Sequence, residues 1–195
     1  MQEVDEEREK RERDAFQAVT LKLLESRTVI VADEINKRLA HRVMAELLLL
    51  DREDPQKEIT VLINSHGGDA DAAFAIYDII RFIRPPVKIV CAGLVASAAV
   101  VILLAGKKEN RLTLPNSRFL IHQPSTGVIG TAADIEIEAS EILKFRDKID
   151  RLIATETGQT FEKVQSDTKR NFWMSAQDAV QYGLVDRIIT NTTEI

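Results

Sequence analysis

The chain has 195 residues, of which 45% are hydrophobic and 29% charged, and its net charge at neutral pH is −5. This size suits one globular domain with a sizeable core. The negative charge gives no reason to expect nucleic acid or an anionic membrane as a partner. No apolar stretch reaches the ~18 residues that a membrane-spanning helix requires. The single cysteine, Cys91, excludes an internal disulfide and fits a cytoplasmic location. We expect it to pack as a small hydrophobic residue in a strand.

Cofactors leave no signature in the sequence. Cysteine, histidine and carboxylate residues do not cluster with the spacing of zinc ligands, and we expect neither a metal nor a cofactor.

The first 26 residues form a charged N-terminal arm, which we separate from the domain at 27–195. Residues 1–14 hold seven acidic and four basic residues. Three acid–base pairs stand four residues apart: Glu6–Lys10, Glu7–Arg11 and Glu9–Arg13. Such pairs support an exposed helix, and a frayed, solvated arm is an equal alternative. The apolar residues that follow should dock the arm onto the domain.

The domain alternates strands and helices along its length. Strands are expected at 27–33, 58–64, 87–93, 111–114, 118–122 and 184–189, and helices at 41–51, 69–84, after Ser97, at 131–159 and at 175–183. This alternation predicts an α/β fold in which helices cross between parallel strands. The run EITVLIN at 58–64 has apolar residues that would point to both faces of a strand, which predicts a strand buried on both faces.

The longest expected helix, 131–159, carries one apolar stripe. Its members are Ile135, Ile142, Phe145, Ile149, Leu152 and Ile153. A helix of this length exceeds what a small domain needs to cover its own sheet. Large apolar patches are uncommon on monomers, so the stripe packs either on the home core or on a partner subunit.

Ser97 is the one hydroxyl in the small, apolar stretch CAGLVASAAVVILLAGKK at 91–108. It is either the cap of a buried helix or a nucleophile at a helix N-terminus, whose positive end favours developing negative charge. His122 ends the strand RFLIH. It is either a neutral base that works near physiological pH or a hydrogen-bonded structural histidine.

Gly67 and Gly68 follow the expected strand 58–64 after Ser65 and His66. Their backbone N–H groups could form an oxyanion hole for a tetrahedral intermediate, or the pair could be an ordinary turn before a helix. His66 adjoins them and could reach the same cleft. His41 is expected on the surface of its helix.

Five segments together resemble the ClpP family, the proteolytic subunit of the Clp protease: INSHGGDADAAFAIYDIIRFI, AGLVASAAVVILLAG, LPNSRFLIHQP, ADIEIEASEILK and MSAQDAVQYGLVDRI. The resemblance covers roughly 27–190 in order. It implies a ClpP/crotonase-like βαβ superhelix with a head domain and a protruding handle helix at about 131–159. It implies Ser97 as the nucleophile, His122 as the general base, and Gly68 and Ala98 as the oxyanion-hole donors.

The third residue of the family triad is an aspartate, and the resemblance places Asn171 there, in SDTKRNFWMSAQ. An asparagine carbonyl can orient the imidazole but supplies no charge to stabilise imidazolium, and a comparable change has cost about 10⁴-fold in a serine protease. Asp167, one turn away, could substitute for it.

The resemblance implies a serine endopeptidase that assembles into heptameric rings, with two rings stacked into a barrel of fourteen subunits. A homo-oligomer and a hetero-oligomer with a sister subunit are both open. Peptides or unfolded proteins delivered by a Clp ATPase are the expected substrates. Thr60 and Leu62 replace the aromatic pair that docks these ATPases in the family, so stimulation should be weak or absent.

Two other functions compete with this interpretation. A catalytically weak, regulatory paralogue would act in a mixed barrel beside an active sister subunit. A crotonase-like acyl-CoA enzyme would share the fold and the oxyanion geometry. The pair Ser97 and His122 disfavours the crotonase hypothesis, because those enzymes generally use glutamates beside the oxyanion hole.

Overall fold

The computed structural model describes residues 18–125 and 127–195. The acid–base pairs expected within 1–14 lie outside these ranges. Residues 18–25 are helical and lead into the first strand. The strands are β1 (Thr28–Ile35), β2 (Ile59–Gly68), β3 (Val87–Ala96), β4 (Arg111–Thr113), β5 (Arg118–Ile121), β6 (Phe172–Ser175) and β7 (Arg187–Ile188). The helices are α2 (Lys37–Glu53), α3 (Ala70–Phe82), α4 (Ala98–Leu103), α5 (Ala132–Thr157), α6 (Phe161–Thr168) and α7 (Ala176–Tyr182).

One sheet organises these elements, with the main strand order β1-β2-β3-β4-β7. Every pairing along this path is parallel, which confirms the α/β fold expected from the alternation. The end of β3 leaves β4 and pairs with β5 instead, where Leu94–Ala96 lie beside Arg118–Leu120. Strand β6 runs antiparallel to β5. No strand was expected at Phe172–Ser175, and β6 is the strand that runs antiparallel in this part of the sheet.

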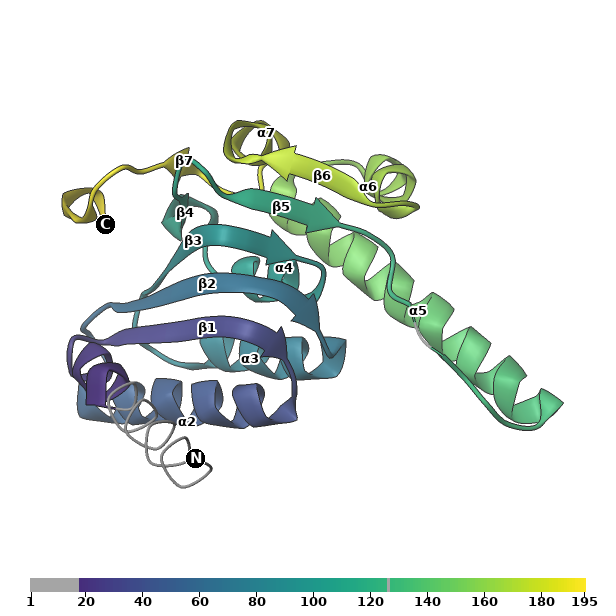
Figure 1. Ribbon diagram of the computed structural model, residues 1–195, viewed down its shortest axis with the longest axis horizontal. Helices are drawn as coiled ribbons and strands as arrows, with labels where there is room; N and C mark the ends of the chain where they lie inside the picture. Colours follow the sequence, from purple (N-terminus) through teal and green to yellow (C-terminus); the bar gives the residue numbers. More distant parts are fainter. Residues whose placement is uncertain (1–17, 126) are drawn as a thin grey trace, which may run out of the picture.

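Helices α2 and α3 lie along one face of the sheet (Figure 1). Strand β2 therefore alternates: Ile59, Val61 and Ile63 are fully buried, whereas Thr60 and Leu62 are half-buried. The prediction that this strand is buried on both faces is wrong. Its apolar residues do point to both faces, but one face is covered and the other is partly exposed.

Strand β2 continues through Gly67 and Gly68, which pair with Glu34 and Ile35 of β1. The expectation that the glycines follow the strand is therefore wrong. Gly68 has φ +145°, and a Cβ built on it would lie 2.2 Å from the carbonyl oxygen of Ile35. A side chain there would clash with backbone, so glycine is required for the two strands to meet at this edge.

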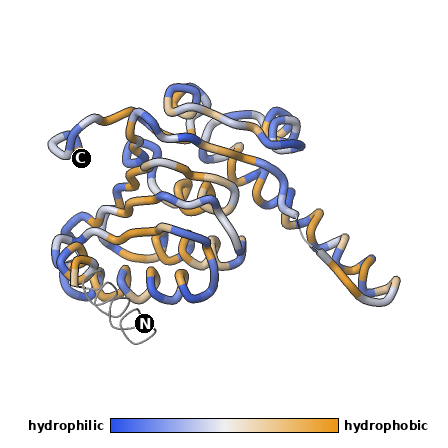
Figure 2. The backbone as a smooth tube through the Cα atoms, in the orientation of Figure 1, coloured by the Kyte–Doolittle hydropathy of each residue, from blue (hydrophilic) through white to orange (hydrophobic). Residues whose placement is uncertain are grey.

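Helix α5 confirms the long helix expected at 131–159. A capping box between Thr131 and Asp134 begins it, and Gly158 in the left-handed conformation ends it. The helix extends beyond the body of the domain (Figure 1), and Figure 2 shows hydrophobic colour along its protruding half.

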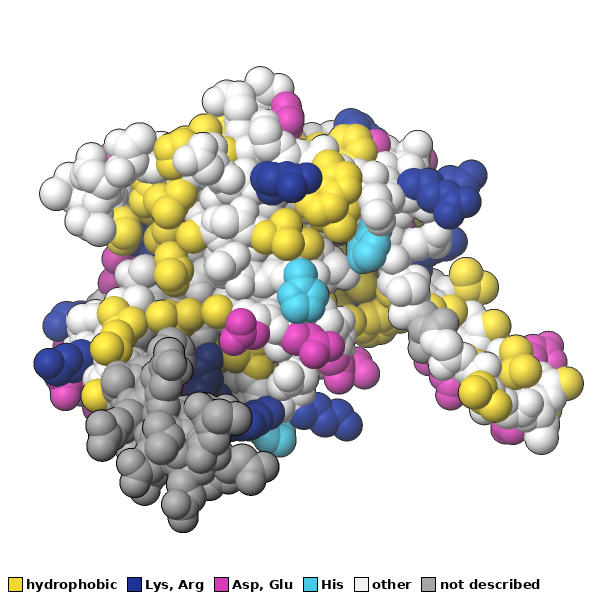
Figure 3. All heavy atoms as spheres, in the orientation of Figure 1, with side chains coloured by type: hydrophobic (Ala, Val, Ile, Leu, Met, Phe, Trp, Pro, Cys, Tyr) yellow, Lys and Arg dark blue, Asp and Glu magenta, His cyan; other side chains and the backbone are white. Residues whose placement is uncertain are grey.

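The apolar stripe of α5 is divided between two environments. Ile149 and Ile153 are buried in the domain core, whereas Ile135 is 46% exposed. Two apolar residues of α5 outside the stripe, Ile137 and Leu143, are 61% and 55% exposed. Hydrophobic and acidic side chains both lie on the protruding end in Figure 3. The home core thus covers only the C-terminal half of the stripe.

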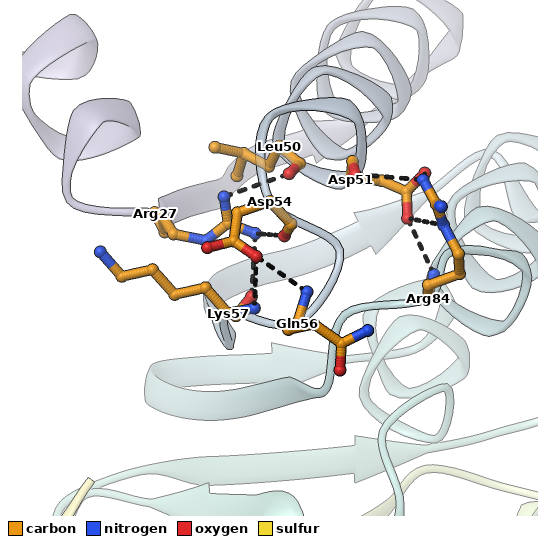
Figure 4. Close-up of polar contacts among 7 residues, drawn as sticks. All are labelled: Arg27, Leu50, Asp51, Asp54, Gln56, Lys57 and Arg84. Atoms are coloured by element: carbon orange, nitrogen blue, oxygen red, sulfur yellow. Dashed lines mark hydrogen bonds and ion pairs between the residues drawn. The ribbon is translucent and has the colours of Figure 1, made fainter.

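Arg27 joins the end of α2 to the sheet (Figure 4). It is 5% exposed, and its guanidinium donates to four carbonyl oxygens, those of Leu50 at 3.1 Å, Asp54 at 2.9 Å, Lys57 at 2.8 Å and Glu58 at 3.2 Å. The Leu50 carbonyl lies in the last turn of α2 and also accepts the N–H of Asp54 at 3.2 Å, whereas the other three carbonyls follow the helix. One buried cation therefore joins the end of α2 to the turn that leads into β2.

Two smaller expectations are confirmed. Cys91 is a free, fully buried thiol in β3, and burial raises its pKa well above the ordinary value. His41 is exposed on α2. Within the part of the chain that the structure describes, no helix is long and apolar enough to cross a membrane.

Candidate active site

Ser97 lies between the end of β3 and the start of α4. Its φ of 56° and ψ of −122° are unusual for a residue with a side chain, and such strain is found mainly at functional sites. Its N–H donates to the carbonyl of Leu120 at 2.9 Å, which anchors the turn to β5. The helix expected to start at Ser97 begins at Ala98 and is only six residues long.

The sheet brings His122 to Ser97. Because β5 pairs with the end of β3, the residue after β5 lies beside the residue after β3. His122 Nε2 is 2.7 Å from Ser97 Oγ. Residues 25 positions apart thus form a direct hydrogen bond between a hydroxyl and an imidazole.

Asn171 completes a chain of three side chains. It directly precedes β6, and Ile121 pairs with Phe172 across the antiparallel ladder, so His122 and Asn171 are neighbours. His122 Nδ1 is 3.1 Å from Asn171 Oδ1. An amide oxygen only accepts, so this contact places the proton of a neutral imidazole on Nδ1 and leaves Nε2 free to accept from Ser97.

A cavity of about 630 Å³ opens beside this chain. Ser97, His122, Gly68 and Ala98 all line it, so both candidate oxyanion-hole residues face the same space as the hydroxyl. Its other lining residues include the apolar Val100, Val101, Ile121, Ile142, Phe145, Ile149 and Ile153 and the acidic Asp69, Asp71, Glu138 and Glu141. The cavity has the size of a small-molecule or peptide side-chain site.

Two other candidates lie elsewhere. His66 is exposed on β2 and is not among the residues that line the cavity. Asp167, considered as a substitute for the missing carboxylate, accepts from Lys163 Nζ at 2.7 Å and from the Tyr182 hydroxyl at 2.9 Å. The partner of His122 is the Asn171 amide.

Gln123 is a residue that the sequence analysis overlooked. Its backbone N–H donates to the carbonyl of Thr168 at 2.7 Å, and its side-chain amide donates to the carbonyl of Lys169 at 3.0 Å. It ties the residue after His122 to the segment before Asn171. Its place beside the histidine in RFLIHQP was the only sequence signal.

The described ranges 18–125 and 127–195 contain no group of three or more His, Cys, Asp or Glu residues that could hold a metal ion.

Comparison with known proteins gives one consistent answer. The family model described as Clp protease matches residues 9–192. The ATP-dependent Clp protease proteolytic subunit 2 of Treponema denticola is 48% identical over 193 residues, which are 99% of this chain and 96% of that relative. A solved asparagine-to-aspartate mutant of ClpP1 from Listeria monocytogenes matches with a TM-score of 0.83 and 47% identity, over 90% of this chain and 98% of that one. The chain belongs to the Clp protease family.

Proposed function

We propose that this Clp protease subunit is a serine endopeptidase in which Ser97 is the nucleophile and His122 the general base. The observation that supports it best is the 2.7 Å contact between Ser97 Oγ and His122 Nε2, at a strained turn that faces a cavity. A serine hydroxyl is a poor nucleophile until a base accepts its proton. Nε2 is free to do so because Nδ1 donates to Asn171.

The reaction follows from these positions. Ser97 Oγ attacks the peptide carbonyl carbon as its proton moves to His122 Nε2, and the N–H groups of Gly68 and Ala98 stabilise the oxyanion. The imidazolium then gives the proton to the leaving amine, and the peptide C–N bond breaks. Water, deprotonated by His122, hydrolyses the acyl-serine and frees both products.

The activity of each subunit is proposed to be weak. The Asn171 dipole orients the imidazole, but no carboxylate offsets the positive charge that His122 gains in the transition state. Asn171 is also exposed, which favours competition by water for its amide. Hydrolysis of a short fluorogenic peptide by the wild type and by Ser97→Ala tests the proposal, and activity that survives the substitution would contradict it.

We extend the proposal to assembly. The exposed apolar end of α5 at Ile135, Ile137 and Leu143 suits burial against other subunits, as larger exposed patches commonly do. Heptamers and fourteen-subunit double rings are the proposed states, with this chain alone or with a sister subunit. Native mass spectrometry across protein and salt concentrations should give these masses, and a monomer throughout would contradict it.

The partner is proposed to be a Clp ATPase in the cytoplasm that delivers peptides or unfolded proteins. The relative from Treponema denticola is named as ATP-dependent. Leu62 is half-buried and packs against Val90, Leu112 and Ile189, and neither it nor Thr60 offers an aromatic ring to an ATPase loop. Stimulation by a standard Clp ATPase should therefore be weak, and robust degradation of a folded substrate would contradict this.

Asn171 also favours a second candidate, a regulatory subunit that acts in a mixed barrel beside an active sister. A fluorophosphonate probe separates the two, since only the endopeptidase should be labelled at Ser97 when the chain is assembled alone. The acyl-CoA alternative is not carried further, because the chain belongs to the Clp protease family.

A further inference from the structure

Asp150 is a buried carboxyl that the proposed reaction does not use. It lies on α5 and is 1% exposed. Its Oδ1 is 2.9 Å from the Thr168 hydroxyl, and its Oδ2 is buried without a hydrogen-bond partner. A buried carboxylate oxygen without a donor is costly, so its persistence here needs an explanation.

The number of hydrogens available to Asp150 and Thr168 explains why the buried carboxyl is tolerated. Thr168 Oγ1 is 2.9 Å from Asp150 Oδ1 and 2.9 Å from the carbonyl oxygen of Val164, but a hydroxyl has only one hydrogen to donate. An ionised Asp150 can only accept, so one of the two contacts then lacks a hydrogen. A neutral Asp150 donates to Thr168, which donates to Val164, and both contacts become hydrogen bonds.

This chain of hydrogen bonds reaches the candidate active site. Thr168 ends α6, and its carbonyl accepts the backbone N–H of Gln123 at 2.7 Å. Gln123 directly follows His122, and Asn171 lies three residues after Thr168. The position of Thr168 therefore affects both ends of the 3.1 Å contact between His122 Nδ1 and Asn171 Oδ1.

We infer that Asp150, in its neutral form, is a positioning residue that holds Thr168 and so sets the geometry of His122 and Asn171. This inference rests on the proposed function for its effect on catalysis. The hydrogen-bond chain itself does not depend on that function.

The charged neighbours of Asp150 act in opposite directions. Burial raises the pKa of Asp150, the Thr168 hydrogen bond and Arg146 on α5 lower it, and Asp147 on α5 raises it; burial is the largest influence. On α7, Tyr182 donates a hydrogen bond to Asp167 on α6. Burial and this hydrogen bond raise the pKa of Tyr182, and the negative charge of Asp150 adds to the effect. Raising the pH ionises Asp150, draws the Thr168 hydrogen away from Val164 and should loosen the site.

Two substitutions separate the neutral form from the charge. Asp150→Asn stays neutral at every pH and can donate from its amide to Thr168. Asp150→Leu has a similar size and no donor. Asp147→Asn is the matched control, because it removes an acidic group three residues away, nearly one helical turn, whose carboxylate pairs with exposed Arg151.

The experiment measures the rate of fluorophosphonate labelling of Ser97 between pH 5 and 9, together with amide hydrogen exchange at Gln123. Asp150→Asn should match the wild type at the acidic end within about twofold. Asp150→Leu should be slower by at least about tenfold, since small misplacements of catalytic groups cost this much or more. Exchange at Gln123 should increase in Asp150→Leu alone, and Asp147→Asn should behave as the wild type at the acidic end.

Three outcomes would overturn the inference. They are Asp150→Asn as slow as Asp150→Leu, Asp150→Leu with wild-type labelling and exchange, or a ratio of wild-type to Asp150→Asn labelling that rises with pH. A ratio that falls or stays level supports the neutral form. If Ser97 is labelled in no variant, the proposed function fails and Gln123 exchange alone decides the role of Asp150.

Discussion

Arg27 and Ser97 adopt nearly the same unusual backbone angle at opposite ends of the sheet. Their φ values are 61° and 56°, in the region that side chains disfavour. Arg27 precedes β1, and its guanidinium donates to four carbonyl oxygens, those of Leu50, Asp54 and Lys57 being drawn in Figure 4. Ser97 follows β3, and its hydroxyl contacts His122 Nε2 at the edge of a cavity.

The comparison separates strain that supports the fold from strain that supports chemistry. At Arg27 the hydrogen bonds that offset the strain come from the side chain itself. At Ser97 a backbone bond to Leu120 holds the turn, and the side chain is left for the reaction. Removing the first side chain should therefore cost stability, and removing the second should cost activity.

The largest expected effect is on activity at the Ser97 end. Ser97→Ala and His122→Ala should each lower kcat for a fluorogenic peptide by at least about 10³-fold, because the two residues act as one unit. Circular dichroism and native mass should stay unchanged, since the substitutions remove groups that face the cavity. A rate within tenfold of the wild type for either variant would show that the Ser97 end of the sheet is not the source of the activity.

The second effect is on stability at the Arg27 end. Arg27→Ala removes the Arg27 donor from four carbonyl oxygens, one of which, that of Leu50, still accepts the Asp54 N–H, and should lower the free energy of unfolding by about 3 kcal/mol. Denaturant titration measures it. Arg84→Ala is the control, because its bridge to Asp51 at the same helix end is exposed and should matter much less. Equal losses for both variants would contradict a special stabilising role for the hydrogen bonds of Arg27.

The third effect sharpens the account of the site. Asn171→Asp should raise kcat by at least about tenfold, or ~1.4 kcal/mol of barrier. The gain should vanish in combination with His122→Ala, because a carboxylate acts only through the imidazole. It should also move the acidic limit of activity, since a neighbouring anion raises a histidine pKa. An unchanged rate in a confirmed double ring would mean that Asn171 is not the limiting residue.

The smallest effect tests the strain directly. Ser97→Gly should stabilise the fold by roughly 1 kcal/mol, because glycine adopts this φ without penalty. Ser125→Gly is the matched control in the same cavity lining, where φ is not positive and no gain is expected. Thermal unfolding compares them, and a loss of stability in Ser97→Gly would argue against stored strain.

Much of the fold could be predicted from the sequence, because its helices and strands follow from local residue patterns. The alternation of strands and helices was expected from residue patterns, and so was the long helix at 131–159, which the structure has as α5. Strand β6 was missed because Phe172–Ser175 is only four residues long and is defined by its pairing with β5. The Gly67–Gly68 pair was placed outside β2 because the sequence does not reveal that β1 extends to meet it.

Less of the candidate site than of the fold could be predicted from the sequence. Ser97 and His122 were each ambiguous from the residues, and the resemblance to the ClpP family supplied their pairing. The positive φ of Ser97 has no sequence signature, since serine does not favour it. The network from Asp150 through Thr168 to Gln123 joins three separate segments, so it emerges only when the segments are packed together.

The most direct test of the account is the mass of the assembled chain after reaction with a fluorophosphonate probe. One adduct per subunit is predicted, located at Ser97, absent from Ser97→Ala and His122→Ala, and retained in Ser125→Ala, where a second serine that lines the cavity is removed. An adduct that persists in Ser97→Ala, or no adduct on the wild type, would contradict the activation of Ser97 by His122.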